Sequence, residues 1–172
     1  MKKFKLKTLI VCSLLAALSI VFGKFLAIPV GDSIRFSFEN TPIFIAGFLF
    51  GPLCGVLTAV VADLVGGLMV YGGSVNLIIT LGAAIIGFSG GILYRLLKSK
   101  LILKIVISVA VAHIMGSVLI KSLGIHLVYG SPYGVLLCWR SLNYLIMTFI
   151  DTFILYFLFK STSFNKLAET LK

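Results

Sequence analysis

Charged and titratable side chains inside apolar segments are the residues of this chain that could do chemistry. Asp63 and His113 lie near the middle of long apolar runs, Lys121 and Arg140 lie nearer the ends of theirs, and Asp151 lies deep in the last run. Ionisable groups are expensive inside a membrane, so each is a candidate for function. A small membrane enzyme using Asp63, His113 and Asp151 is one reading, although no HExxH, GxSxG or GxxxxGK[ST] motif accompanies them.

Helical spacing gathers the polar residues into stripes, because residues four apart share a helix face. The first stripe is His113, Ser117 and Lys121; the second is Arg140, Tyr144, Met147 and Asp151, with Asn143 beside it; Asn76 and Thr80 share a third face. Polar stripes avoid lipid, so we expect them to face one another inside a helix bundle. The cations Lys121 and Arg140, with Arg35 in a nearby loop, predict positive charge at the mouth of a pocket.

Such a pocket suits a small ligand with an aromatic body and a carboxylate, which an arginine binds in bidentate geometry. Aromatic residues can form flat walls, and Asp63 can accept hydrogen bonds from a ring amine. The predicted substrate-binding residues are Arg35, Phe36, Phe38, Asp63, Tyr71, Asn76, Lys121, Trp139, Arg140 and Asn143, with Tyr129 as a further wall. We expect no catalytic residue, no metal and no cofactor.

Structural roles compete with these ligand roles. Asp63 can equally form an ion pair with a lysine or arginine. A core histidine bonded to a helix backbone is the better interpretation for His113, and structural pairing or a helix-to-helix hydrogen bond is the better one for Asp151. Trp139 can be an interfacial belt residue, and Lys121 can extend its ammonium to the membrane surface.

The composition excludes a water-soluble globular domain. The 172 residues are 60% hydrophobic and 12% charged, whereas soluble domains carry about 25% charged residues. The net charge of +10 comes from basic clusters between apolar runs, which indicates membrane topology rather than nucleic-acid binding. The three cysteines have neither disulfide-framework nor zinc-site spacing.

The apolar runs predict an all-α integral membrane protein, with six transmembrane helices in one compact bundle that forms a single domain over 1–172. The predicted helices cover about 8–28, 42–50, 53–70, 75–97, 101–123 and 135–159, with polar loops between them and a short polar tail. The first run also resembles a signal peptide, but we favour a membrane span because Lys24 follows it directly. Eleven of the 15 Lys and Arg lie on the side of the termini, which places both termini in the cytoplasm.

Small residues on the first helix predict a contact with another subunit. Cys12 and Ala16 lie on one strip of this helix, and Ser13 and Ala17 lie on the next. Small side chains let two helix backbones approach closely in lipid, within one chain or between chains.

Residues 34–67 carry the most specific pattern of the chain. It consists of Ile34-Arg35-Phe36-Ser37-Phe38, Pro42-Ile43, Ala46-Gly47-Phe48-Leu49-Phe50-Gly51-Pro52, Gly55 and Ala62-Asp63-Leu64-Val65-Gly66. This pattern resembles the folate-family substrate-binding (S) components of energy-coupling factor (ECF) transporters. Leu14–Ser19 is similar to their first helix, and Arg140–Asp151 is similar to their last.

The resemblance implies a six-helix S component in the plasma membrane of a prokaryote. It would capture a vitamin from outside and dock through its first helix on a transmembrane coupling subunit, driven by two separate cytoplasmic ATPases. Folate or a related pterin is the expected vitamin, although residues 71–77 and 121–124 differ from the folate-type pattern. Another anionic vitamin such as pantothenate is the alternative within this class; a small membrane enzyme and a non-catalytic scaffold are the alternatives outside it.

Overall fold

The structure is a computed structural model that describes residues 6–30, 34–70 and 75–171, without the side chains of 29, 30, 34, 35, 70, 163, 165, 167 and 171. Its elements in chain order are α1 (Leu6–Ile20), η1 (Val21–Phe25), β1 (Ile28–Val30), β2 (Ile34–Phe36), α2 (Asn40–Phe50), α3 (Pro52–Val70), α4 (Leu77–Leu96), α5 (Leu101–Ala112), η2 (His113–Ile120), α6 (Lys121–Tyr129), α7 (Tyr133–Lys160) and α8 (Thr162–Leu171), where η1 and η2 are π-helical.

Five apolar helical segments of the described chain are long enough to cross a membrane. They are Leu6–Phe25, Pro52–Met69, Leu77–Leu96, Leu101–Tyr129 and Tyr133–Lys160. The remaining apolar helix, α2, has 11 residues, about 16 Å at 1.5 Å per residue. That is short of the roughly 30 Å of a bilayer core. A helical membrane protein is thus what the structure describes, while the six-span topology and the cytoplasmic termini stay predictions.

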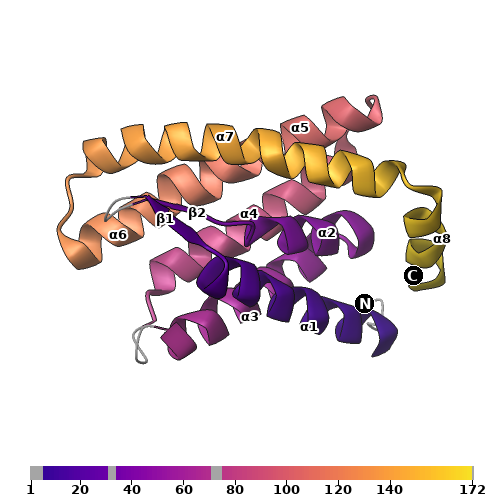
Figure 1. Cartoon of the computed structure of the whole chain (residues 1–172), viewed down its shortest axis with the longest axis horizontal. Coiled ribbons are helices and arrows are strands. Elements are labelled where there is room, and N and C mark those ends of the chain that lie inside the picture. Colours follow the sequence, from indigo (N-terminus) through magenta and orange to yellow (C-terminus); the bar gives the residue numbers. More distant parts are fainter. Residues whose placement is uncertain (1–5, 31–33, 71–74, 172) are drawn as a thin grey trace.

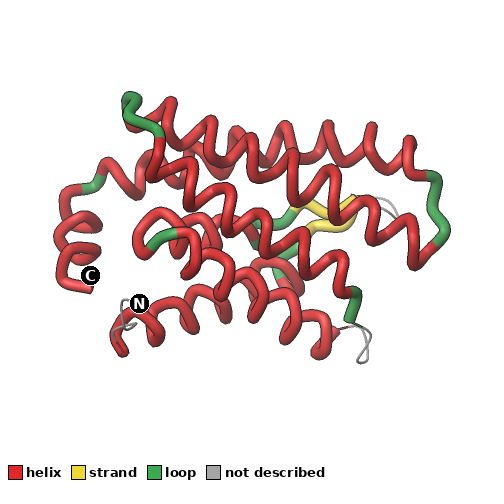
Figure 2. The backbone as a smooth tube through the Cα atoms, turned by 180° about the vertical axis from the view of Figure 1, so that it is seen from behind, coloured by secondary structure: helices red, strands yellow, loops and turns green. Residues whose placement is uncertain are grey.

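The helices pack lengthwise around α4, which contacts α2, α3, α5, η2 and α6. The core between them contains Phe44, Ile86, Ile105 and Leu155, all at most 1% exposed. Both ends of the chain lie at one end of the bundle, and the hairpin and α6 lie toward the other (Figure 1). Seen from behind, the strands again lie away from the termini (Figure 2).

Glycines allow α3 and α4 to touch along their backbones. A Cβ atom built on Gly87 would meet the Gly55 carbonyl and the Val56 nitrogen, and one on Gly91 would meet the backbone of Pro52. Small residues at this contact are what close helix packing in lipid requires.

Three segments differ from the sequence prediction. The loop predicted over 29–41 contains an antiparallel hairpin that pairs Ile28 with Phe36 and Val30 with Ile34. The fifth helix does not end at 123 but continues to Tyr129, because Gly124 fits against Ile78 and Ile79, and the helix stops only at Gly130 with φ +68°. The polar tail forms α8, whose Phe164 and Ala168 pack on the core.

Candidate ligand cavity

A cavity of about 620 Å³ opens at the end of the bundle that lies away from the termini. This volume falls within the range of about 300–1,000 Å³ that small-molecule sites occupy. Residues of η1, of the segment that precedes α2, and of the helices α3, α4, α6 and α7 with their flanking turns line this cavity. The lining residues are Gly23, Lys24, Ser37, Glu39, Asp63, Gly67, Val75, Asn76, Ile79, Lys121, Ile125, Tyr129, Ser131, Leu136, Arg140, Asn143 and Tyr144.

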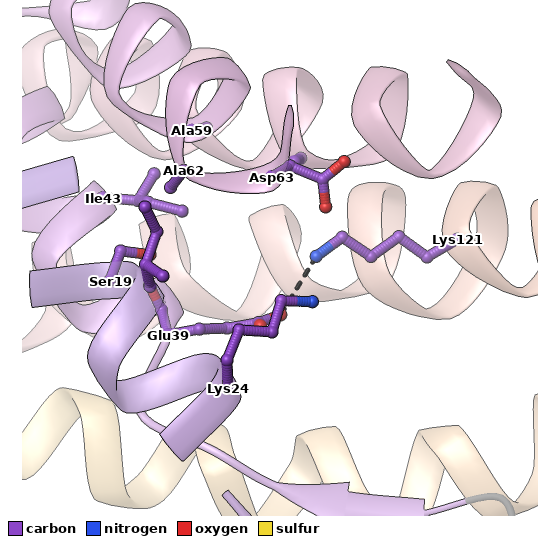
Figure 3. Close-up of a pocket in the computed structure, with 10 residues that line it drawn as sticks. Ser19, Lys24, Glu39, Ile43, Ala59, Ala62, Asp63 and Lys121 are labelled. Carbon is purple, nitrogen blue, oxygen red and sulfur yellow. Dashed lines mark hydrogen bonds and ion pairs between the residues drawn. The ribbon is translucent and has the colours of Figure 1, made fainter. Parts of the chain in front are cut away.

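Four charged side chains form the inner end of this cavity, and we call Lys24, Glu39, Asp63 and Lys121 the inner charge cluster. Lys121 Nζ lies 3.1 Å from Glu39 Oε1, and Thr80 donates a hydrogen bond of 2.6 Å to Asp63 Oδ2. Figure 3 shows the four side chains converging from separate elements. The same four residues also line a void of about 20 Å³, room for about one water, between the cavity and the core.

Glu39 is the carboxylate that the cations of the cavity surround. It lies in the turn before α2, outside the five candidate spans. Burial by itself raises the pKa of Glu39, but the positive charges of Lys121, Lys24 and Arg140 outweigh it and lower the pKa below its ordinary 4.5. Glu39 therefore carries its negative charge at neutral pH.

Arg140 is held in one orientation by η2. Its Nε donates a hydrogen bond of 3.1 Å to the Ser117 carbonyl, and its guanidinium carbon lies 5.3 Å from the ring centre of Tyr144. A guanidinium has five N–H donors, so this hydrogen bond leaves most of the fork for a ligand. Such a fork binds a carboxylate with two parallel hydrogen bonds.

Asparagines complete the polar lining at two places. Asn76 caps α4, because its side chain accepts from the Ile78 and Ile79 nitrogens and donates to the Gly124 carbonyl at 2.9 Å. It therefore fixes the contact between α4 and α6 besides lining the cavity. Asn143 is buried one turn from Arg140 on α7.

The structure brings together five of the predicted substrate-binding residues. Asp63, Asn76, Lys121, Arg140 and Asn143 all line the cavity. The predicted wall residue Tyr129 lines it too, at the end of α6.

Other predicted wall residues lie elsewhere. Trp139 is 54% exposed and does not line the cavity, because it is rotated by about 100° from Arg140 around α7. Phe36 and Phe38 are half-buried outside the lining, and Phe38 packs edge-on against Phe22. The predictions for Arg35 and Tyr71 concern side chains outside the described part of the chain.

Lys24, Ser37, Glu39 and Tyr144 line the cavity but are missing from the predicted set. Glu39 lies in the predicted polar loop over 29–41, and Lys24 lies near the end of the predicted first helix over 8–28. One signal was available, since Glu39 is one of only five acidic residues in the chain. Tyr144 was already on the stripe of Arg140.

His113 and Asp151 belong to a separate buried network below the cavity. Asp151 accepts a hydrogen bond from Thr41, and its other oxygen lies 3.4 Å from His113 Nε2. The amide nitrogen Nδ2 of Asn40 lies 3.3 Å from His113 Nε2, and the hydroxyl oxygen of Thr148 lies 3.0 Å from His113 Nδ1. The network joins α2, η2 and α7, as the structural interpretation of these residues expects.

The predicted docking strip on α1 divides into two faces. Cys12 and Ala16 are 7% and 2% exposed, with Cys12 against Cys54 of α3, so this half of the prediction is corrected. Ser13 and Ala17 are exposed. The two pairs differ because one residue along a helix is a rotation of about 100°.

The fold and the cavity together define a helical membrane protein with a polar cavity between its helices. A family model described as "ECF transporter, substrate-specific component" matches residues 7–170. The chain therefore belongs to the family of substrate-specific components of ECF transporters.

Solved structures show the same fold. The crystal structure of FolT bound with folic acid is 23% identical, with a TM-score of 0.75, covering 90% of this chain and 93% of that one. The S component for biotin from an ECF-type ABC transporter is 20% identical, with a TM-score of 0.67 over 90% and 92%. The S component of a bacterial ECF transporter is 22% identical, with a TM-score of 0.66 over 96% and 98%. The search of curated proteins gave no match.

Proposed function

We propose that this chain captures folate or a related pterin in the cavity of about 620 Å³. The observation that carries the proposal is the combination of Arg140, oriented to receive a carboxylate, with carboxylates at the inner end of the same cavity. The pterin ring offers amine and N–H groups to carboxylates, and its glutamate tail offers carboxylates to cations. A structure of similar fold, FolT, was solved with folic acid bound.

The proposed setting is the plasma membrane of a prokaryote, with both termini in the cytoplasm and the cavity open to the outside. The chain has no phosphate-binding loop of the GxxxxGK[ST] type, so energy comes from separate ATPases. We propose that it docks on a transmembrane coupling subunit through the exposed α1 face around Ser13 and Ala17, and that it is not itself an enzyme.

Titration of the detergent-purified chain with folic acid and with pantothenate tests the choice of vitamin. We expect tight binding of folic acid and at least tenfold weaker binding of pantothenate. The reverse order would replace folate with an open-chain anionic vitamin and keep the transport role.

Two outcomes would favour the other classes. Chemical turnover of a small molecule by the purified chain, lost in Asp63→Asn or His113→Ala, would support a membrane enzyme. Absence of tight binding to any vitamin, with Arg140→Ala having no effect in cells, would support a scaffold.

A further inference from the structure

The inner charge cluster contains as many carboxylates as ammonium groups. Lys24 comes from η1, Glu39 from the turn before α2, Asp63 from α3 and Lys121 from α6. Because the four charges cancel, the inner end of the cavity does not by itself favour an anion. It presents hydrogen-bond acceptors and donors side by side.

Stability alone is a weak reason for this cluster. Buried ion pairs cost desolvation and can often be replaced by apolar side chains of similar volume without loss of stability. The cluster also keeps bonding capacity, since a carboxylate offers about four lone-pair sites and an ammonium three donors. Of the bonding capacity of Glu39, Asp63 and Lys121, the Lys121–Glu39 pair and the Thr80–Asp63 hydrogen bond use only part.

Ring compounds match such an array better than open chains do. In a lactam or a cyclic urea, the ring holds the amide cis, so that N–H and C=O point to the same side. An open-chain secondary amide is trans, and its N–H and C=O point in opposite directions. A ring edge can therefore place its donor on a carboxylate and its acceptor on a neighbouring ammonium, which a single trans amide cannot do.

We propose that the inner charge cluster determines specificity by binding the N–H/C=O edge of a lactam or ureido ring, while Arg140 binds the carboxylate of the same ligand. The inference rests on the proposed function, in that it assigns the vitamin to this cavity. It deepens that function, because it selects a ring-bearing anion and rejects an open-chain one. Glu39 and Asp63 are the acceptors, and Lys121 is the donor.

The test measures binding of folic acid, biotin and pantothenate to the full purified chain in detergent. Folic acid and biotin carry a lactam-type and a ureido edge, and pantothenate carries an open-chain amide. The variants are Glu39→Gln and Asp63→Asn, which keep side-chain size and remove one charge each. Glu169→Gln, on the exposed surface of α8, is the matched control.

We expect the tightest vitamin to be one of the two ring compounds. Each of the two variants should weaken that binding roughly 10- to 100-fold, as for hydrogen bonds to charged groups, while Glu169→Gln leaves it unchanged. If folic acid is that vitamin, 4-aminobenzoylglutamate, which lacks the pterin ring, should compete with an affinity that the variants do not change. Thermal unfolding of each variant separates lost contacts from lost folding.

Several outcomes separate this inference from the proposed substrate. Tight biotin binding with the same variant effects would discard folate and keep the role of the cluster. Preference for pantothenate, or unchanged affinity for the ring vitamin in both variants, would overturn the role of the cluster even if the cavity binds a vitamin. No binding of any of the three would overturn both. If neither variant folds, the wild-type ranking of the three vitamins decides.

Discussion

A hydrogen bond to the backbone of another helix and a tyrosine ring on its own helix orient the Arg140 side chain. The Ser117 carbonyl lies in η2, where the wider turn of a π-helix is common at functional sites. Tyr144, one turn further along α7, lies beside the guanidinium. The orientation of the Arg140 side chain is therefore set by η2 and by its own helix α7, through residues 23 positions apart in the chain.

Replacing Arg140 with alanine tests its role as the carboxylate partner. We expect Arg140→Ala to lower vitamin affinity by about 1.5–3 kcal/mol, the value of hydrogen bonds to charged groups, in a binding titration. Arg140→Lys should recover only part of the loss, because an ammonium cannot bind bidentately. Arg95→Ala, at the opposite end of α4 from the cavity, is the control that should change nothing; equal affinity of Arg140→Ala and wild type would remove Arg140 from the site.

The Thr41–Asp151 hydrogen bond makes a prediction about stability. Thr41→Val and Asp151→Ala should each lower the free energy of unfolding by roughly 1–3 kcal/mol, because the valine removes a donor from the buried carboxyl and the alanine leaves the buried Thr41 hydroxyl without its acceptor. The double variant should cost clearly less than the sum, as for residues in contact. Thermal melts in detergent measure this, and strict additivity would contradict the proposed coupling.

At the scale of single residues, helical periodicity predicts some of the residues that line the cavity and misses others. Lys121, Arg140 and Asn143 follow from helix spacing alone, because their stripes must avoid lipid. Glu39 does not, because it meets Lys121 across 82 residues only after η1 and the hairpin turn the chain back over the bundle. No local pattern contains that path.

Among the elements, α3 and α4 pack so closely that a glycine at their contact leaves no space for a larger side chain. Gly87→Ala should lower thermal stability, by about 1–3 kcal/mol for an overpacked contact, because its Cβ would meet the Gly55 backbone. Gly67→Ala is the matched control on α3, since its Cβ would meet only a Val75 methyl group at 4.0 Å. Equal melting temperatures for the two variants would show that the helices separate without cost.

The exposed face of α1 makes a prediction about assembly. Ala17→Trp should block co-purification with the coupling subunit, because an indole prevents close helix approach, and should leave vitamin affinity unchanged. Leu145→Trp, which puts the same ring on the exposed face of α7, is the control. Normal assembly of Ala17→Trp would move the docking surface away from this face.

Helix ends show what sequence signals can and cannot predict. The predicted break between the helices over 42–50 and 53–70 agrees with the structure, where Gly51 separates α2 from α3. The helix predicted over 101–123 stops one residue before Gly124, but Ile78 and Ile79 of α4 cover Gly124 and the helix continues. The hairpin is missed although Ile34–Phe38 alternates between apolar and polar residues, because each strand has only three residues and β1 contains Pro29. The helix α8 is missed because it packs on the core by only a few apolar residues.

On the scale of the whole molecule, the hydrophobic composition indicates that the protein lies in a membrane, and the packing of the helices determines where the cavity forms. Apolar side chains cover the outside, including Leu145, Phe149 and Phe153 on α7. Polar side chains from η1, α3, α6 and α7 line the cavity, and Figure 1 shows α6 at the end of the bundle away from the marked chain ends. That the cavity lies between the helices follows from the tertiary arrangement rather than from any single span.

The central claim is that this cavity carries a vitamin, and mass spectrometry of the small molecules released from the detergent-purified chain tests it most directly. We predict that folate or a related pterin is released from the wild type and is absent from Arg140→Ala prepared in parallel. Release of a different anionic vitamin would keep the claim that the cavity binds a vitamin and would replace folate as the proposed substrate. Release of no small molecule, together with no binding across a vitamin panel, would contradict the claim.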